Sequence, residues 1–76
     1  MNISYDKQAD AMYIRFQEDK VEKTIKIQEG IIIDINSNGN LLGIELLDVS
    51  LKMPLESLSH IGFDFPIEKH KTLTSA

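Results

Sequence analysis

The sequence predicts an α+β fold, in which an antiparallel β-meander of about five strands carries one short C-terminal helix packed on one face. Apolar and polar residues alternate with a period of two over most of the chain before Asp48, the pattern of half-buried strands. Asn38-Gly39 separates two such runs, and Asn-Gly is a strong hairpin signal because both residues tolerate the positive φ of a type I′ turn. Beyond Asp48 the period changes, and Pro54 stands where a first helical turn accepts proline.

The expected strands follow one another along the chain, separated by polar or glycine-containing turns. They span residues 2–5, 11–16, 21–27, 31–35 and 41–47. Centring a turn on Asn38-Gly39 fixes the register of the last hairpin and brings six apolar residues to one face, which we expect to be buried. The facing pairs are Ile35 with Leu42, Ile33 with Ile44, and Ile31 with Leu46.

The turn before Ile31 is chosen by the same apolar pattern. A two-residue loop would send Ile25 and Ile27 to the face opposite Ile31 and Ile33, because a slip of one residue turns over every side chain of a strand. A three-residue loop over residues 28–30 keeps all four together, with Ile27 facing Ile31 and Ile25 facing Ile33. We therefore expect that loop, with Gly30 in the left-handed region.

The predicted helix covers residues 53–60 and carries an apolar stripe of Leu55, Leu58 and Ile61, with Gly62 as its stop. A short extended piece over residues 63–65 follows. We expect one small domain over residues 1–67 and a flexible tail over residues 68–76, which has little to bury.

Size and composition limit how such a chain is stabilised. A domain of 76 residues is marginal, and domains of this size often rely on disulfides, a metal or a partner subunit. The chain has no cysteine, and His60 and His70 are too few and too far apart for a zinc cluster. We therefore expect a homo-oligomer.

The net charge of −4 indicates which partners suit the chain. It disfavours binding to nucleic acid, which needs a basic face, and suits a small basic protein partner. No apolar run approaches the roughly 20 residues of a membrane span, and residues 2–10 do not read as a signal peptide. We expect a cytoplasmic protein without a membrane partner.

An ordered series of short motifs resembles a family of small bacterial and archaeal proteins, Domain of Unknown Function 2283. The motifs cover roughly residues 3–50. They are Tyr5-Asp6, Ala9-Asp10, Tyr13-Ile14, Gly30 with the strand over 31–35, Gly43-Ile44-Glu45 and Leu47-Asp48. The resemblance implies no established activity. Some members of the family lie beside genes for small toxin-like proteins, which implies an antitoxin-like role.

Four acidic residues in these motifs are the candidates for a metal or small-ligand site: Asp6, Asp10, Glu45 and Asp48. Converging carboxylates suit Mg²⁺ or Ca²⁺. The simpler interpretation is structural, because aspartate shapes turns by accepting backbone N–H groups and caps helices in the same way. We favour it for Asp6 and Asp10 in the first turn and for Asp48 before the helix, while Glu45 has no evident structural duty.

The favoured function is a non-enzymatic protein–protein interaction module, because the sequence shows no recognisable catalytic constellation and calls for no cofactor. The second face of the predicted sheet mixes apolar and polar residues, as interfaces do. We expect Tyr13, Arg15, Ile32 and Leu47 to lie at a protein interface, since tyrosine and arginine are enriched at binding hot spots. The alternative is a small-ligand or divalent-metal binding protein that uses the four carboxylates.

Overall fold

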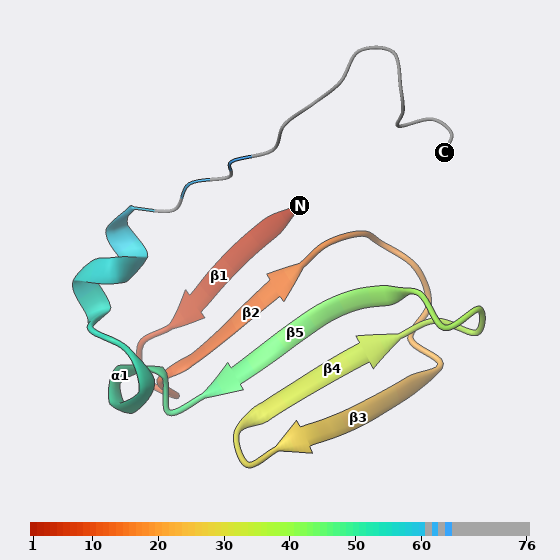
Figure 1. Ribbon diagram of the computed structural model, residues 1–76, viewed down its shortest axis with the longest axis horizontal. Helices are drawn as coiled ribbons and strands as arrows, with labels where there is room; N and C mark the ends of the chain where they lie inside the picture. Colours follow the sequence, from red (N-terminus) through yellow and green to blue (C-terminus); the bar gives the residue numbers. More distant parts are fainter. Residues whose placement is uncertain (61, 63, 65–76) are drawn as a thin grey trace.

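The computed structural model describes residues 1–60, 62 and 64, and its main element is one antiparallel sheet of five strands (Figure 1). The predicted five-stranded antiparallel sheet is confirmed. The strands are β1 (Asn2–Asp6), β2 (Ala11–Arg15), β3 (Lys23–Gln28), β4 (Ile31–Ile35) and β5 (Leu41–Leu47). The third strand begins two residues later than predicted, and Val21 is 44% exposed in the connection before it.

The strand order β1-β2-β5-β4-β3 places the last strand in the centre of the sheet. Consecutive strands pair in the β1–β2 hairpin and in the meander of β3, β4 and β5. The hairpin joins this meander through β2, which pairs with β5, and the connection from β2 to β3 passes around the ends of β5 and β4 (Figure 1). β1 and β5, the first and last strands that carry the motifs, are therefore separated by β2 alone.

One face of the sheet carries an isoleucine at the same level of every strand. Neighbouring residues in the register are Ile3, Ile14, Ile44, Ile33 and Ile25, which we call the isoleucine row. The next row on this side contains Tyr5, Met12, Leu46, Ile31 and Gln28. We call this side the isoleucine face. The predicted pairs Ile25–Ile33, Ile33–Ile44 and Ile31–Leu46 are confirmed.

Two β-bulges alter the rest of the predicted register. Ile35 pairs with Leu41 instead of Leu42, because the ladder shifts between Asp34 and Ile35. On the other side of β4, Gln28 rather than Ile27 pairs with Ile31, because the ladder shifts between Lys26 and Gln28. A bulge takes one extra residue into a strand. It allows a two-residue turn at Glu29-Gly30 without turning Ile25 away from Ile33, and the three-residue loop was therefore wrong, although Gly30 does have a positive φ of 80°.

The predicted type I′ turn centred on Asn38-Gly39 was wrong, because the chain turns one residue earlier, at Ser37-Asn38. Gly39 has a φ of 81°, whereas Asn38 is not among the residues with positive φ. The Gly39 amide donates to the Asn36 carbonyl at 3.0 Å, and the Asn36 side-chain oxygen accepts the amides of Asn38 and Asn40 at 3.0 and 2.9 Å. Asn36, which is only 6% exposed, thus accepts the backbone amides of the loop through its side chain. With these amides bonded, the loop forms without a type I′ turn.

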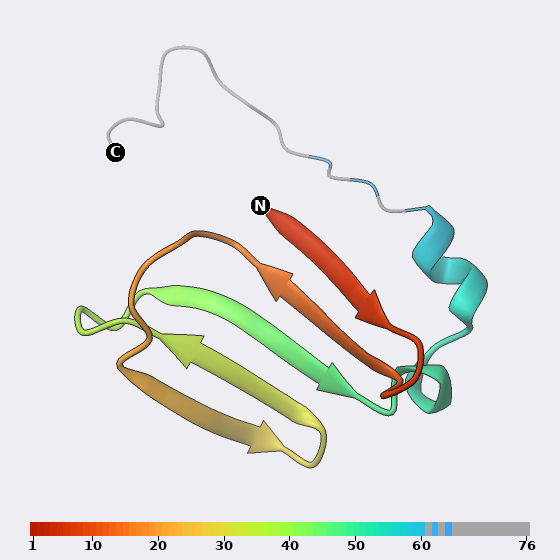
Figure 2. The same cartoon turned by 180° about the vertical axis from the view of Figure 1, so that it is seen from behind.

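Two short helical segments follow the sheet: α1 (Val49–Lys52), which the sequence analysis missed, and the 3₁₀-helix η1 (Leu55–Ser59) inside the predicted range. Both lie beyond the end of β5 and over neither face of the sheet (Figures 1 and 2). Packing of the helix on one face is therefore not seen in the described residues, and Leu55 is 44% exposed. Residues 61, 63 and 65–76 lie outside the described part, as do most of the predicted extended piece and the whole predicted tail.

The hydrophobic core of the described residues is small. Met12, Leu42 and Val49 are the buried apolar side chains of this part, while all five members of the isoleucine row are half-buried. No helix in the described part is long and apolar enough to cross a membrane. The sheet thus leaves much of its apolar side uncovered by the residues that the structure describes.

Candidate functional site

The second side of the sheet presents a mixed set of side chains, which we call the tyrosine face. One row across it contains Ser4, Tyr13, Glu45, Ile32 and Lys26, and the next contains Asn2, Arg15, Gly43, Asp34 and Thr24. Leu47 follows Glu45 two residues later on the same side of β5. The four predicted interface residues, Tyr13, Arg15, Ile32 and Leu47, therefore share one face, and their role in an interface stays a prediction.

The Tyr13 side chain crosses the central strand β5 and links β2 to β4, the two strands on either side of β5. Its hydroxyl donates to Asp34 Oδ2 at 2.8 Å, so a side chain of β2 reaches β4 over β5. Asp34 Oδ1 accepts the Thr24 hydroxyl at 2.7 Å, which extends the connection to β3. Burial raises the pKa of the Tyr13 phenol, and the hydrogen bond to Asp34 raises it further. The phenol is therefore held neutral and in one position.

Gly43 provides the space through which Tyr13 passes. A Cβ at Gly43 would overlap the Tyr13 hydroxyl oxygen and Cζ, and would lie 2.8 Å from Cε2. Its backbone φ is not in the left-handed region, so the requirement is for space and not for an unusual conformation. Glycine inside a strand often marks a close approach of another group, and here that group is the tyrosine ring.

Arg15 and Glu45 place opposite charges beside this fixed ring. The Arg15 guanidinium carbon lies 5.4 Å from the centroid of the Tyr13 ring, within the range of a cation–π contact. Glu45 pairs directly with Tyr13 in the register and with Ile32 on its other side. Among the described residues, no side-chain hydrogen bond or ion pair is formed by Glu45. Its carboxylate thus lies between an aromatic and an aliphatic side chain on an open face.

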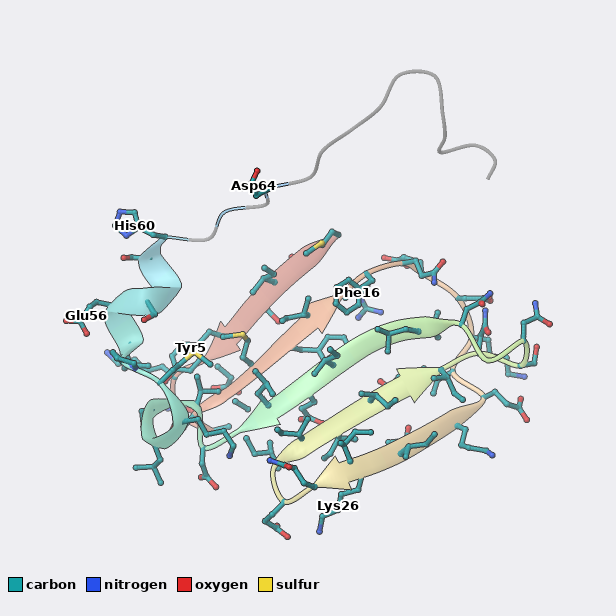
Figure 3. All side chains as sticks on the ribbon, viewed as in Figure 1. Tyr5, Phe16, Lys26, Glu56, His60 and Asp64 are labelled. Atoms are coloured by element: carbon teal, nitrogen blue, oxygen red, sulfur yellow. The ribbon has the colours of Figure 1, made fainter. Side chains whose placement is uncertain are left out.

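Asp10 has a different duty, at the end of the sheet. It has a φ of 53°, and its carboxylate accepts the Ser50 amide at 3.1 and 3.2 Å and the Ser50 hydroxyl at 2.6 Å. The Tyr5 hydroxyl donates to the same carboxylate at 2.7 Å, and the Val49 amide donates to the Asp10 carbonyl at 3.0 Å. The Ser50 hydroxyl and then the Tyr5 hydroxyl lower the pKa of Asp10. Asp10 therefore caps α1 from the first hairpin (Figure 3 labels Tyr5, at the end of β1 nearest α1).

The other predicted acidic residues divide between turn and helix. Asp6 accepts the amides of Gln8 and Ala9 at 3.0 and 3.2 Å, which confirms its role in shaping the first turn. Asp48 occupies the N-cap position of α1 with a φ of 53°, but its side chain makes no capping hydrogen bond. The predicted cap at Asp48 was therefore wrong, because its left-handed backbone leaves Asp10 to accept the amide of the helix.

These positions separate the four candidate carboxylates into two places. Asp6, Asp10 and Asp48 lie at the end of the sheet near α1, and Glu45 lies on the tyrosine face. Within the described residues, no group of three or more metal-binding side chains is found, and no pocket is detected. The structure shows Asp10 fully engaged by hydroxyl and amide donors.

Sequence reasoning missed three residues that hold these arrangements: Asp34, Thr24 and Ser50. Asp34 and Gly43 are opposite each other in the β4–β5 register, and a glycine within a strand pattern is itself a signal of close approach. An aspartate opposite a strand glycine suggests that a long side chain from another strand passes over the glycine. Only the pairing of β2 with β5 identifies that side chain as Tyr13. Ser50 carries no signal of its own.

A comparison with protein-family models gives a match to the family described as "Protein of unknown function (DUF2283)", over residues 2–50. The chain belongs to this family. The DUF2283 match contains all five strands and ends at Ser50, the residue that Asp10 holds. It thus includes both the Tyr13 crossing and the Asp10 cap. Searches of curated proteins and of solved structures found no match to this DUF2283 protein.

Proposed function

We propose that this DUF2283 protein is a non-enzymatic protein–protein interaction module that binds its partner through the tyrosine face. The observation that carries the proposal is the immobilised Tyr13 ring. Asp34 holds its hydroxyl at 2.8 Å, Gly43 leaves room beneath it, and Arg15 stacks on it at 5.4 Å. Aromatic and arginine side chains dominate binding energy at interfaces, and side chains that are already ordered lose less entropy on binding.

The residues around the ring complete a compact contact surface. Ile32 and Leu47 are both half-buried. Ile32 is paired with Glu45 on the neighbouring strand β4, and Leu47 lies two residues beyond Glu45 on β5. Apolar side chains next to a fixed tyrosine give the water-excluding centre that interfaces need, with charged groups at its rim. The half-buried state of Ile32 and Leu47 leaves apolar surface on each for a partner to cover.

Charge favours a basic partner. The whole chain has a net charge of −4. The tyrosine face carries both signs, Glu45 and Asp34 with Arg15 and Lys26, and Glu45 is the carboxylate of this face that makes no hydrogen bond among the described residues. A partner with lysine or arginine side chains at the matching position would gain a charge-assisted hydrogen bond there. A small basic protein is thus the partner class, and the toxin-like proteins encoded beside some members of the family are the first to test. The resulting role is antitoxin-like, by occlusion of a basic surface in the cytoplasm.

The test compares capture by wild-type and variant proteins from cells of the source organism, followed by mass spectrometry. We expect wild type to retain a small basic protein in stoichiometric amount, and Glu45→Lys to lose it because the like charges now repel. Glu18→Lys makes the same charge change in the exposed loop after β2 and is the matched control. Tyr13→Ala and Arg15→Ala should also reduce retention.

If wild type retains no stoichiometric protein, or if Glu45→Lys and Glu18→Lys behave alike, the tyrosine face is not the binding surface. Far-ultraviolet circular dichroism of each variant checks that the sheet is intact before binding is compared.

A further inference from the structure

The isoleucine face is an apolar surface that the described residues leave open. All five residues of the isoleucine row are half-buried, and neither α1 nor η1 lies over them (Figures 1 and 2). Only three apolar side chains of the described part are buried, which is a small core for a five-stranded sheet. Small domains often add a disulfide, a metal or a partner subunit to such a core, and this chain has no cysteine.

We propose that the isoleucine face packs against the same face of a second copy of this chain, so that two sheets form the core of a homodimer. The inference concerns the opposite side of the sheet from the partner-binding surface proposed above, and it does not depend on that proposal. Two sheets stacked face to face in this way form a sandwich whose inner side chains interdigitate.

The chemistry of the face favours an identical partner over a charged one. Its two central rows hold eight aliphatic residues or methionines, together with Tyr5 and Gln28 at their ends, and no charged residue. A basic or acidic partner would have to bury its charges there without a counter-ion, which is costly. A second isoleucine face brings no charge to these two rows, because Lys23, the charged residue of β3 on this side, lies on the edge strand beyond the isoleucine row.

The area of the face matches one side of a small subunit interface. With strands about 4.8 Å apart and about 3.4 Å per residue, five strands of five residues present a flat area of roughly 400 Å². Protruding side chains raise the accessible area above that value, towards the roughly 800 Å² that each partner buries in a standard interface. The face is thus as large as the largest apolar patches of ordinary monomers, about 300–600 Å², and these patches are often functional.

Topology supplies a centre for a symmetric contact. β5 is the middle strand of the five, and Ile44 is the middle residue of the isoleucine row. A two-fold axis between the two sheets, passing over Ile44, stacks β5 on β5 of the second copy and covers both halves of each face. A two-fold contact uses the same surface on both subunits, which an apolar, centred row allows.

The family match favours a second copy over the chain's own C-terminal residues as the cover. The match spans residues 2–50, which contain the whole isoleucine face and exclude everything from Leu51 onward. The matched residues therefore contain the whole isoleucine face without the C-terminal third. We take a second copy of this matched unit as the cover of the face.

The first measurement uses the full wild-type chain. Light scattering should give the mass of two chains, and the thermal unfolding midpoint should rise with protein concentration, because dimerisation couples stability to concentration. A one-chain mass at all concentrations, together with a midpoint that does not change, would overturn the proposal.

Two neighbouring isoleucines of β4 then locate the contact. Ile33→Lys places a charge in the isoleucine row and should raise the dimer dissociation constant by at least roughly 100-fold. Ile32→Lys makes the same change one residue earlier on the tyrosine face; it should leave the dimer mass unchanged while weakening partner capture. A dimer that survives Ile33→Lys and is lost in Ile32→Lys would refute this assignment of the faces. If Ile33→Lys does not fold, Ile25→Lys tests the same row on the edge strand β3, where a charge is tolerated better.

The C-terminal residues are tested in the full chain by replacing Phe63 and Phe65 with serine. With a second copy as the cover, the double variant keeps the dimer mass and a wild-type midpoint at equal concentration. A monomeric wild type whose midpoint falls in the double variant would mean that the C-terminal residues cover the face, and the proposal would be rejected.

Discussion

Gly43→Ala tests whether the passage of Tyr13 over β5 stabilises the sheet. The added methyl group would overlap the tyrosine ring, so the ring must leave and the hydrogen bond from Tyr13 to Asp34 must break. Overpacking of this kind costs about 1–3 kcal/mol, and the lost hydrogen bond about 0.5–1.5 kcal/mol. Alanine regains about 0.5–1 kcal/mol, because glycine loses more backbone entropy on folding. We therefore expect a net loss of roughly 0.5–4 kcal/mol in the free energy of unfolding, with a central value of about 2 kcal/mol.

The assay is urea denaturation followed by far-ultraviolet circular dichroism, with all proteins at one concentration. A loss of 1 kcal/mol lowers the melting temperature of a domain this size by roughly 4–8 °C, so the change is also visible in a thermal scan. Tyr13→Ala removes the ring in advance and provides the control background.

In the Tyr13→Ala background, the same Gly43→Ala change should be neutral or stabilising by up to about 1 kcal/mol, because the alanine now meets no ring. The double-mutant cycle should thus show a coupling energy above about 1 kcal/mol between the two positions. If Gly43→Ala costs the same in both backgrounds, the ring does not determine the need for glycine, and the reasoning fails.

Three further changes probe the other parts of the structure. Replacing Asp10 by Asn keeps the shape and suits the left-handed backbone, so the difference in midpoint reports the carboxylate charge. The pKa of Asp10 in the folded protein is lowered from 3.8, so the stability that its charge contributes is complete above that value and is lost as pH falls through the folded pKa. The difference in midpoint between wild type and Asp10→Asn should therefore be constant near neutrality and shrink below about pH 4. A difference in midpoint that grows with acidity would contradict this. Asn36→Ala should cost about 1–3 kcal/mol in urea denaturation, since it leaves two amides of a closed loop without an acceptor, and a cost under about 0.5 kcal/mol would show that water replaces the side chain. Millimolar Mg²⁺, Ca²⁺ or Mn²⁺ should leave the melting temperature unchanged, whereas a rise would indicate a site among Asp6, Asp10, Glu45 and Asp48.

The strands were predictable because each has its own alternation and its own turn. The pairs Ile25–Ile33 and Ile33–Ile44 followed from keeping apolar residues on one side. The two bulges were not predictable in this way, since alternation assumes an unbroken ladder and a bulge changes the pairing by one residue without changing the face. The same limit led to the wrong loop before Ile31.

The cap of α1 and the Tyr13 crossing were beyond sequence reasoning for a common reason. Both depend on β2 lying against β5, which pairs residues from 28 positions apart, for Arg15 and Gly43, to 36 positions apart, for Ala11 and Leu47. The Asp10–Ser50 contact beyond the end of this pairing joins residues 40 positions apart. Local signals name aspartate as a turn or cap residue, but they select the nearest candidate, which was Asp48. Asp6 was predicted correctly because its partners, the amides of Gln8 and Ala9, are local.

The central position of β5 has a consequence for how the chain acquires its structure during synthesis. β5 is the last of the five described strands to leave the ribosome, yet among them it alone joins the β1–β2 hairpin to β4 and β3. Until residues 41–47 have emerged, the chain contains two separate two-stranded hairpins, and isolated hairpins are marginally stable in water. The nascent chain therefore exposes the isoleucines of both hairpins until β5 has emerged and can insert between the two halves.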